Sequence, residues 1–285
     1  MSYDAYSTLS VIVDRGLAYV TIDHPPINLL DLSMIQDLDR LGRQLEDDDA
    51  VRVAVFRSAN PDFFIAHADV TLIQRMPTEP PPKASTLGPF HRMVERFRTM
   101  PKATIGVLEG RARGGGSEFL LSLDMRFGAL GRAVLAQPEV ALGIIPGGSG
   151  TQRLPRLIGR ARALEVILGC SDIPAELAER WGYLNRALPP DELRPFVDAL
   201  AQRIASFPAS AIALAKAAVN DAELPIEVGL VEEAHRFNLS LATPDAQTRM
   251  ARFIEIGGQT PEVEKGIGAA LERLLGSRPA APARN

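Results

Sequence analysis

The sequence has little of several features that mark whole classes of protein. Its 285 residues include one cysteine, Cys170, so neither an internal disulfide bond nor a thiolate cluster for a metal can form. No apolar stretch approaches the ~18 residues that span a bilayer, and the first ten residues lack the basic start and apolar centre of a signal peptide. We therefore expect a cytoplasmic protein with no membrane partner and no metal site.

The charge balance is equally unremarkable. The formal net charge is −4, which argues against the strongly basic face that a nucleic-acid partner requires. Apolar residues make up 46 % of the chain and charged residues 23 %, as in an ordinary globular protein. The length suffices for one large domain or two smaller ones.

Strand and helix patterns alternate in the first part of the chain. Residues 9–23 indicate two strands joined at Asp14-Arg15-Gly16, and 51–59 and 103–110 indicate further strands. Ser33 with Gln36 resembles a capping box ahead of apolar residues at helical spacing. Five prolines predict an irregular surface loop over 77–89, and an amphipathic helix follows it.

Beyond about residue 150 the patterns are almost entirely helical. Thr243-Pro244 and Thr260-Pro261 are each typical of the start of a helix. We predict an α/β core over 1–205, a helical region over 206–275 and a disordered tail over 276–285. The helices are expected at 160–169, 174–181, 191–206, 210–220, 227–241, 244–256 and 261–275.

Three consecutive glycines, Gly114, Gly115 and Gly116, stand between a predicted strand and a predicted short helix. Glycine lets the main chain approach another group closely, and the start of a helix presents unpaired N–H donors. Two interpretations stay open: a site that holds a developing anion, or a tight turn packed against a neighbour. The run lacks the lysine and the spacing of the known phosphate-binding and dinucleotide-binding loops.

Two glutamates, Glu118 and Glu139, are candidate acid–base residues. Glu118 falls in the first turn of the helix after the glycines, where a carboxylate also stabilises the helix dipole. Glu139 follows a proline between two apolar stretches. Two carboxylates in partly apolar surroundings can have pKa values that are pushed apart, as one acid and one base require.

The segments "GGGSEFLLSLDMRF" and "AQPEVALGIIPGGSGTQRLPRLIGRARALEVIL" resemble the enoyl-CoA hydratase/isomerase family, also called the crotonase superfamily. The likeness runs from about residue 10 to about residue 220. It implies a spiral of strand–strand–helix units with C-terminal helices that build homotrimers or homohexamers. It also implies acyl thioesters of coenzyme A as substrates, with no metal and no cofactor beyond the coenzyme A of the substrate itself.

The resemblance assigns roles to individual residues. The backbone N–H groups of Ala68 and Gly115 would hold the thioester oxygen of an enolate, and Ala66, His67, Asp69 and Gly114 would line the substrate. Glu118 and Glu139 match the family's acid–base pair, and Gly147 matches the residue whose N–H positions water. Both glutamates favour a hydratase, which adds water across a 2,3 double bond.

The sequence also departs from the family pattern. His67 replaces a glycine, Thr71 replaces a lysine that many relatives direct at coenzyme A phosphates, and Arg111 and Arg113 occupy positions that are usually small or apolar. The two arginines are either partners of the substrate phosphates or ion-pair partners of Glu109, and we favour the second interpretation. The departures leave open a carrier-protein thioester as substrate. Two further alternatives on the same scaffold are an isomerase or other enolate-forming enzyme and a non-catalytic family member.

Overall fold

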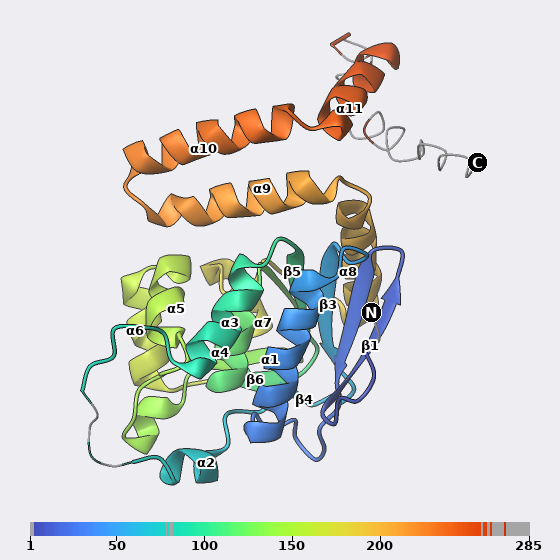
Figure 1. The fold of residues 1–285 in the computed structure, drawn as a ribbon. Helices are drawn as coiled ribbons and strands as arrows, with labels where there is room; N and C mark the ends of the chain where they lie inside the picture. Colours follow the sequence, from blue (N-terminus) through green and yellow to red (C-terminus); the bar gives the residue numbers. More distant parts are fainter. Residues whose placement is uncertain are drawn as a thin grey trace. The chain divides into compact units, whose positions relative to one another are not determined.

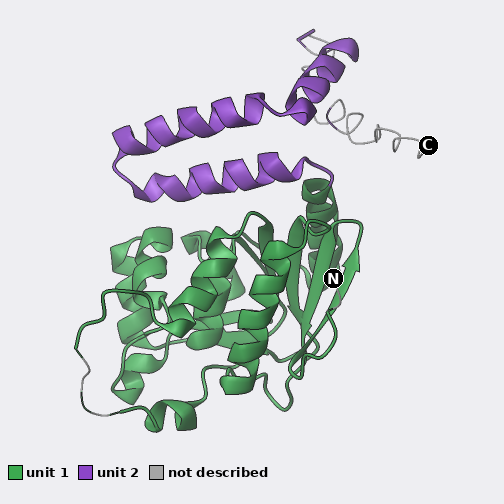
Figure 2. Ribbon diagram, in the orientation of Figure 1, with its two compact units in different colours: residues 1–205 green, residues 206–285 purple. Residues whose placement is uncertain are grey.

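A computed structural model describes residues 3–77, 79, 82–257, 259–260, 263 and 271 (Figure 1). The chain divides into two compact units, residues 1–205 and residues 206–285 (Figure 2). The tail predicted over 276–285 and most of the helix predicted over 261–275 lie outside the described residues.

The first unit begins with the predicted hairpin. Strands β1 (Leu9–Asp14) and β2 (Leu17–Ile22) pair antiparallel along their whole length. Between them Arg15 and Gly16 have φ angles of 48° and 86°, the left-handed values that a two-residue hairpin turn requires. β2 then pairs in parallel with β3 (Val53–Ser58).

The following strands enter two sheets in turn. Each of β3, β5 and β7 joins the larger sheet, and the strand after it, β4, β6 or β8, joins the smaller one. The larger sheet has the order β1-β2-β3-β5-β7-β10 and the smaller one β4-β6-β8-β9. This alternation confirms the α/β spiral of strand–strand–helix units. The remaining bounds are β4 (Phe63–Ile65), β5 (Ala103–Leu108), β6 (Arg111–Arg113), β7 (Met125–Ala129), β8 (Val134–Ala136), β9 (Ile173–Pro174) and β10 (Arg186–Leu188).

Helix α1 (Leu32–Asp47) starts earlier than expected. Its N-cap is Asp31, whose side chain accepts a hydrogen bond from the Met34 amide at 2.9 Å, so the predicted capping box at Ser33 is wrong. Aspartate and serine cap about equally well, and the first available side chain takes the role. Met34, Leu38, Leu41 and Leu45 are all buried, as their spacing predicts.

The amphipathic helix after the proline-rich segment is α3 (Pro89–Thr99), and it packs on the core beside α4 (Gly115–Leu121). Phe97 of α3 and Phe119 of α4 meet edge to face, with ring centroids 5.3 Å apart. Phe56 of β3 contacts both rings at 5.4 Å. Such edge-to-face contacts add to the free energy of burying large rings and fix α4 against the sheet.

Two helices of the first unit were not predicted. The helix α2 (Val70–Gln74) has only five residues, and α5 (Gly150–Ile158) contains Pro155, which disfavours a helical interior. The short 3₁₀ helix η1 (Glu139–Leu142), α6 (Arg160–Gly169) and α7 (Ala175–Trp181) complete this region.

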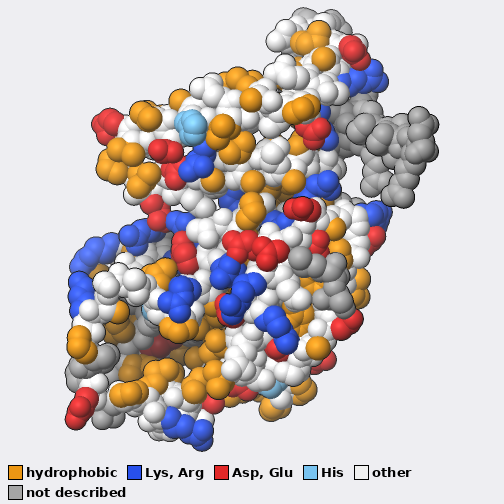
Figure 3. Space-filling model, in the orientation of Figure 1, with side chains coloured by type: hydrophobic (Ala, Val, Ile, Leu, Met, Phe, Trp, Pro, Cys, Tyr) orange, Lys and Arg blue, Asp and Glu red, His pale blue; other side chains and the backbone are white. Residues whose placement is uncertain are grey.

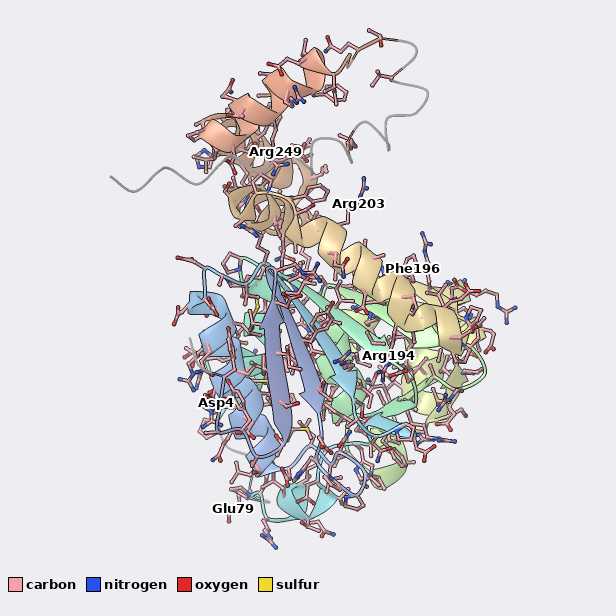
Figure 4. The ribbon with its side chains drawn as sticks, turned by 90° about the vertical axis from the view of Figure 1, so that its right-hand side faces the viewer. Asp4, Glu79, Arg194, Phe196, Arg203 and Arg249 are labelled. Atoms are coloured by element: carbon pink, nitrogen blue, oxygen red, sulfur yellow. The ribbon has the colours of Figure 1, made fainter. Side chains whose placement is uncertain are left out.

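Helix α8 (Pro190–Ala205) crosses a face of the larger sheet and contacts β2, β3, β5, β7 and β10. Phe196 and Arg194 both extend from it (Figure 4). Phe196 packs on Phe127 with ring centroids 5.3 Å apart, and Arg194 makes a bidentate ion pair with Glu109. Glu109 thus pairs with neither Arg111 nor Arg113, so our assignment of its partner was wrong; Arg113 instead pairs with Asp172.

The second unit contains α9 (Ala209–Asn220), the 3₁₀ turn η2 (Asp221–Glu223), α10 (Ile226–Leu241) and α11 (Pro244–Glu255). Thr243 caps α11 as predicted, and Pro244 takes its first position. No residue of α9, α10 or α11 is buried. Across the described residues, no helix combines the length and apolar character needed to cross a bilayer.

Candidate functional site

The three glycines form the start of α4, and each has a steric reason to lack a side chain. Gly114 has a φ of 48°, and a Cβ there would come within 2.5 Å of the Glu139 Oε1 atom. A Cβ on Gly115 would lie 2.9 Å from Leu30 Cδ2, and one on Gly116 only 2.2 Å from the Ile65 carbonyl oxygen. These are distances that real Cβ atoms essentially never show, so the main chain lies directly against its neighbours.

Gly115 lies beside Ala68. The Ala68 amide nitrogen is 3.5 Å from the place that a Gly115 Cβ would occupy. Ala68 pairs with Leu30 in an isolated parallel bridge, but its hydrogen bonds run from Leu30 N to the His67 carbonyl and from Asp69 N to the Leu30 carbonyl. Within the described part of the chain, neither the Ala68 nor the Gly115 N–H donates to a protein acceptor. Two adjacent backbone donors are therefore available to a ligand.

Glu118 is buried, with 3 % of its surface exposed, although it carries a carboxylate. Its Oε1 atom accepts two backbone hydrogen bonds, from Gly148 at 2.8 Å and from Gly150 at 2.7 Å. Burial raises the pKa of Glu118, and the two amide donors partly oppose that rise. Charge-assisted bonds of this length favour the ionised form of a carboxyl group, and here they hold Oε1 in place.

Glu139 opens the 3₁₀ helix η1 and is 9 % exposed. Burial raises the pKa of its carboxyl to about 7, with a smaller contribution from the charge of Glu118. Its Oε2 atom is buried and has no hydrogen-bond partner among the described residues. The two carboxyl groups are close enough to influence each other and have different surroundings, as an acid–base pair needs.

Sequence reasoning missed Gly148 and Gly150. A Cβ on Gly148 would lie 2.5 Å from Glu118 Oε2 and 2.6 Å from Phe90 Cε1, so this glycine fits between the carboxylate and an aromatic ring. The signal was the Gly-Gly-Ser-Gly run after Pro146, from which only Gly147 was chosen. Gly147 itself is exposed, and the nearest atom to its Cβ position is the Ile145 carbonyl oxygen at 3.6 Å.

The other residues expected to line the substrate make hydrogen bonds within the protein. The Ala66 amide donates to Ile27 O, and His67 Nδ1 lies 2.8 Å from the Ala68 carbonyl oxygen. Asp69 caps α2 and accepts hydrogen bonds from both the amide and the hydroxyl of Thr71 at 2.8 Å. These contacts shape the strand-to-helix turn that presents the Ala68 N–H.

Metal-ligating side chains do not gather anywhere in the part of the chain that the structure describes. No group of three or more His, Cys, Asp or Glu side chains is placed to hold an ion there. The carboxyl group of Glu118 instead accepts hydrogen bonds from backbone amides, and that of Glu139 lies against the main chain at Gly114. The arrangement suits proton transfer next to an anion held by main-chain donors.

Comparison with known proteins gives consistent matches over almost the whole chain. The family model described as "Enoyl-CoA hydratase/isomerase" matches residues 13–260. The short-chain-enoyl-CoA hydratase of Clostridium acetobutylicum is 34 % identical over 250 residues, which cover 86 % of this chain and 95 % of that protein. The crotonyl-CoA hydratase of Syntrophomonas wolfei is 33 % identical over 253 residues, with coverage of 88 % and 96 %.

Solved structures agree. A crystal structure of a putative enoyl-CoA hydratase from Streptomyces avermitilis is 38 % identical and aligns with a TM-score of 0.69 over 95 % of this chain and 99 % of that one. The enoyl-CoA hydratase of Bacillus anthracis is 29 % identical and aligns with a TM-score of 0.80 over 87 % and 96 % of the two chains.

Proposed function

Because this chain belongs to the enoyl-CoA hydratase/isomerase family, we propose that it is an enoyl-CoA hydratase, which adds water across the 2,3 double bond of a 2-enoyl-CoA thioester. Relatives named as enoyl-CoA hydratases support this activity. The single observation that carries the proposal is the pairing of two buried carboxyl groups, Glu118 and Glu139, beside two unengaged backbone donors.

The two glutamates take different roles in this proposal. Glu118, whose Oε1 accepts two amide hydrogen bonds, is the ionised base that removes a proton from the attacking water through Oε2. Glu139, with a pKa of about 7, holds a proton near neutral pH and is the acid. A Gly147 N–H that orients the water completes the arrangement, as the family resemblance implies.

The reaction balances without any other reagent. The water oxygen bonds to C3, its proton passes to Glu118, and the electrons of the double bond move to the thioester oxygen as an enolate. The N–H groups of Ala68 and Gly115 stabilise that oxygen, and C2 then takes the proton of Glu139. No electrons leave the substrate, so we propose that no cofactor takes part beyond the coenzyme A of the thioester. Each such donor is worth ~10²–10³ in rate.

The acyl chain has an apolar surface available near the site. Large apolar side chains are exposed immediately after Glu139, and another group precedes Phe90, whose ring borders Glu118 and Gly148. Hydrophobic side chains also gather over this part of the first unit in Figure 3. The group after Glu139 consists of Leu142, Ile144 and Ile145, and the group before Phe90 consists of Val70, Met76 and Leu87. We propose that the hydrocarbon chain of the substrate lies against them.

The substrate carrier is a finer part of the proposal. Thr71 cannot serve as a lysine would, because its hydroxyl is bound to Asp69. A carrier-protein thioester therefore stays a second candidate beside coenzyme A. Turnover of the same enoyl group on coenzyme A and on a phosphopantetheine-bearing carrier protein would decide between them.

The single cysteine supports the cytoplasmic location that we propose.

We also propose that the chain forms a homo-oligomer through its second unit. On α10, Ile226, Leu230 and Phe237 share one face at helical spacing and are 67 %, 55 % and 60 % exposed. Val231, elsewhere around the helix, is 68 % exposed. Exposed apolar side chains that gather on a helix mark an interaction surface, and we propose that a second copy of the chain covers it.

The test is the loss of enone absorbance when the purified protein meets a 2-enoyl-CoA. The proposal expects a 3-hydroxyacyl product and no double-bond isomer. A 3-enoyl-CoA given in parallel identifies the isomerase: conversion to the 2-enoyl compound without hydroxy product would replace the hydratase assignment. Failure of all acyl thioesters to bind would point to a non-catalytic member.

A further inference from the structure

A buried pair of hydroxyl groups lies behind the helix that carries Glu118. The Ser117 Oγ and Tyr183 hydroxyl oxygens are 2.5 Å apart, and both residues are 0 % exposed. Ser117 precedes Glu118 on α4, and Tyr183 follows the end of α7, where its amide donates to the Ala178 carbonyl at 2.8 Å. One hydrogen bond thus joins α4 to a segment 66 residues away.

The Gln137 side chain reaches the same place. It is 0 % exposed, and neither of its amide atoms has a hydrogen-bond partner of good geometry in the described part of the chain. From the position of a Cβ on Gly150, Gln137 Nε2 is 3.1 Å away and Glu118 Oε1 is 3.0 Å away. Gln137 also precedes Pro138 and Glu139 in the chain, so it connects this region to the second carboxyl group.

Tyr183 remains a neutral partner throughout the working pH range. Burial raises the pKa of its hydroxyl to about 12, while Ser117 and Gln137, both close to that oxygen, partly lower it. A phenol that does not ionise can hold a fixed hydrogen-bond pattern. It therefore binds the segment that carries Glu118 without adding a charge to the site.

The short helix α4 needs such support. It has seven residues, and its N-cap, Gly114, makes no side-chain hydrogen bond. Glu118 and the Gly115 N–H both belong to it, so a small rotation about its axis would move the base and the oxyanion donor together. The aromatic contacts of Phe119 hold α4 against the sheet, and the directional bond between Ser117 and Tyr183 further limits the rotation of the helix.

We propose that Tyr183 is a positioning residue for Glu118 and for the Gly115 N–H: its hydroxyl binds Ser117 on α4 and so limits the rotation of the helix that carries both groups. This inference rests on the proposed hydratase function.

The experiment compares Tyr183→Phe, Ser117→Ala and the double variant with the wild type in hydration of a 2-enoyl-CoA. We expect each single variant to lower kcat about tenfold, with KM changed less than twofold, because one directional hydrogen bond is lost. The double variant should be no worse than either single one, since both remove the same bond. The pH dependence of kcat should also shift, because the surroundings of the carboxyl groups change.

Tyr6→Phe is the matched control. The Tyr6 hydroxyl binds Gln44 in the first unit, away from the glutamates, so its loss should leave kcat and the pH profile unchanged. Thermal unfolding of every variant separates stability from catalysis. Should Tyr183→Phe fail to fold, Ser117→Ala tests the same bond with a smaller change.

Several outcomes would overturn the inference. A Tyr183→Phe enzyme that unfolds at a lower temperature but keeps the wild-type kcat and pH profile would make the pair purely structural. Additive losses in the double variant would mean that the two hydroxyls act separately. A wild type without turnover on any enoyl thioester would overturn the proposed function and this inference together, whereas an active wild type matched by both single variants would overturn the inference alone.

Discussion

The Oε1 atom of Glu118 lies 2.7 Å from the amide nitrogen of Gly150, a residue 32 positions later in the chain. Gly148 donates to the same oxygen at 2.8 Å. The loop after η1 and the first residue of α5 therefore hold one oxygen of the buried carboxylate in place. In the proposed mechanism the other oxygen acts on a water molecule. This relationship underlies the proposed division of labour between the two glutamates.

Replacement of either glutamate by glutamine should remove one proton-transfer step. Glu118→Gln and Glu139→Gln are each expected to lower kcat for hydration by ~10²–10⁴, because the amide is nearly isosteric but can neither accept nor deliver the proton. Steady-state kinetics on a 2-enoyl-CoA measure the change. Wild-type rates in both variants would show that neither carboxyl group takes part.

The pH dependence of the rate should follow the ionisation of Glu139. Hydration uses its protonated form, so kcat should fall as the pH rises through about 7. Dehydration of the 3-hydroxyacyl product uses the ionised form, so its kcat should fall as the pH drops through the same range. Measurement in both directions checks the sign, and identical profiles would contradict the assignment of Glu139 as the acid.

The same carboxyl group should affect stability. Its pKa rises from 4.5 to about 7 on folding, so the folded protein binds this proton more tightly than the unfolded chain does. The resulting stabilisation is complete below pH 4.5 and is lost as the pH rises through 7. Glu139→Gln should therefore be more stable than the wild type above pH 7, by up to ~3 kcal/mol, and equally stable near pH 4. Thermal unfolding at pH 4 and pH 8 compares the two proteins, and a constant difference would exclude this linkage.

A side chain at Gly148 should disturb the held carboxylate. Gly148→Ala would place a methyl group 2.5 Å from Glu118 Oε2 and 2.6 Å from Phe90, so one of them must move. We expect kcat to fall at least tenfold. Gly169→Ala is the matched control, because a Cβ there meets no atom within 4 Å, and its rate should stay within twofold of the wild type.

The sequence predicted the parts of the molecule that depend on local patterns. The hairpin at Arg15-Gly16, the alternating strands and the C-terminal helices follow from turn chemistry and periodicity. The motif resemblance supplied Glu118 and Glu139, and the structure buries both beside backbone donors. The resemblance also carried the choice of Ala68, whose surroundings contain no local signal of their own.

Contacts between distant segments were beyond this reasoning. The Glu109–Arg194 ion pair joins residues 85 positions apart, and no pattern near Glu109 indicates that partner. Likewise, the amides that donate to Glu118 come from the start of α5 and the loop before it. That helix was not predicted, because Pro155 lies inside it. These contacts depend on how distant segments pack, whereas the hairpin and the helices depend on local sequence propensity.

The oligomer proposal predicts a change in mass on a single substitution. Leu230→Glu places a charge in the exposed apolar face of α10 and should lower the molar mass measured by light scattering, because a charge buried in an interface is costly. Leu168→Glu is the control, since Leu168 is similarly exposed, at 62 %, but belongs to the first unit. A wild type that is monomeric at all concentrations would exclude the proposal.

A crystal structure of the chain with a saturated acyl-CoA, which cannot be hydrated, tests the central claim most directly. We predict that the thioester oxygen lies 2.7–3.1 Å from the amide nitrogens of both Ala68 and Gly115, the usual range for such donors. C2 and C3 should lie between the carboxyl groups of Glu118 and Glu139. A ligand whose thioester oxygen contacts neither amide, or whose acyl carbons point away from both glutamates, would contradict the account.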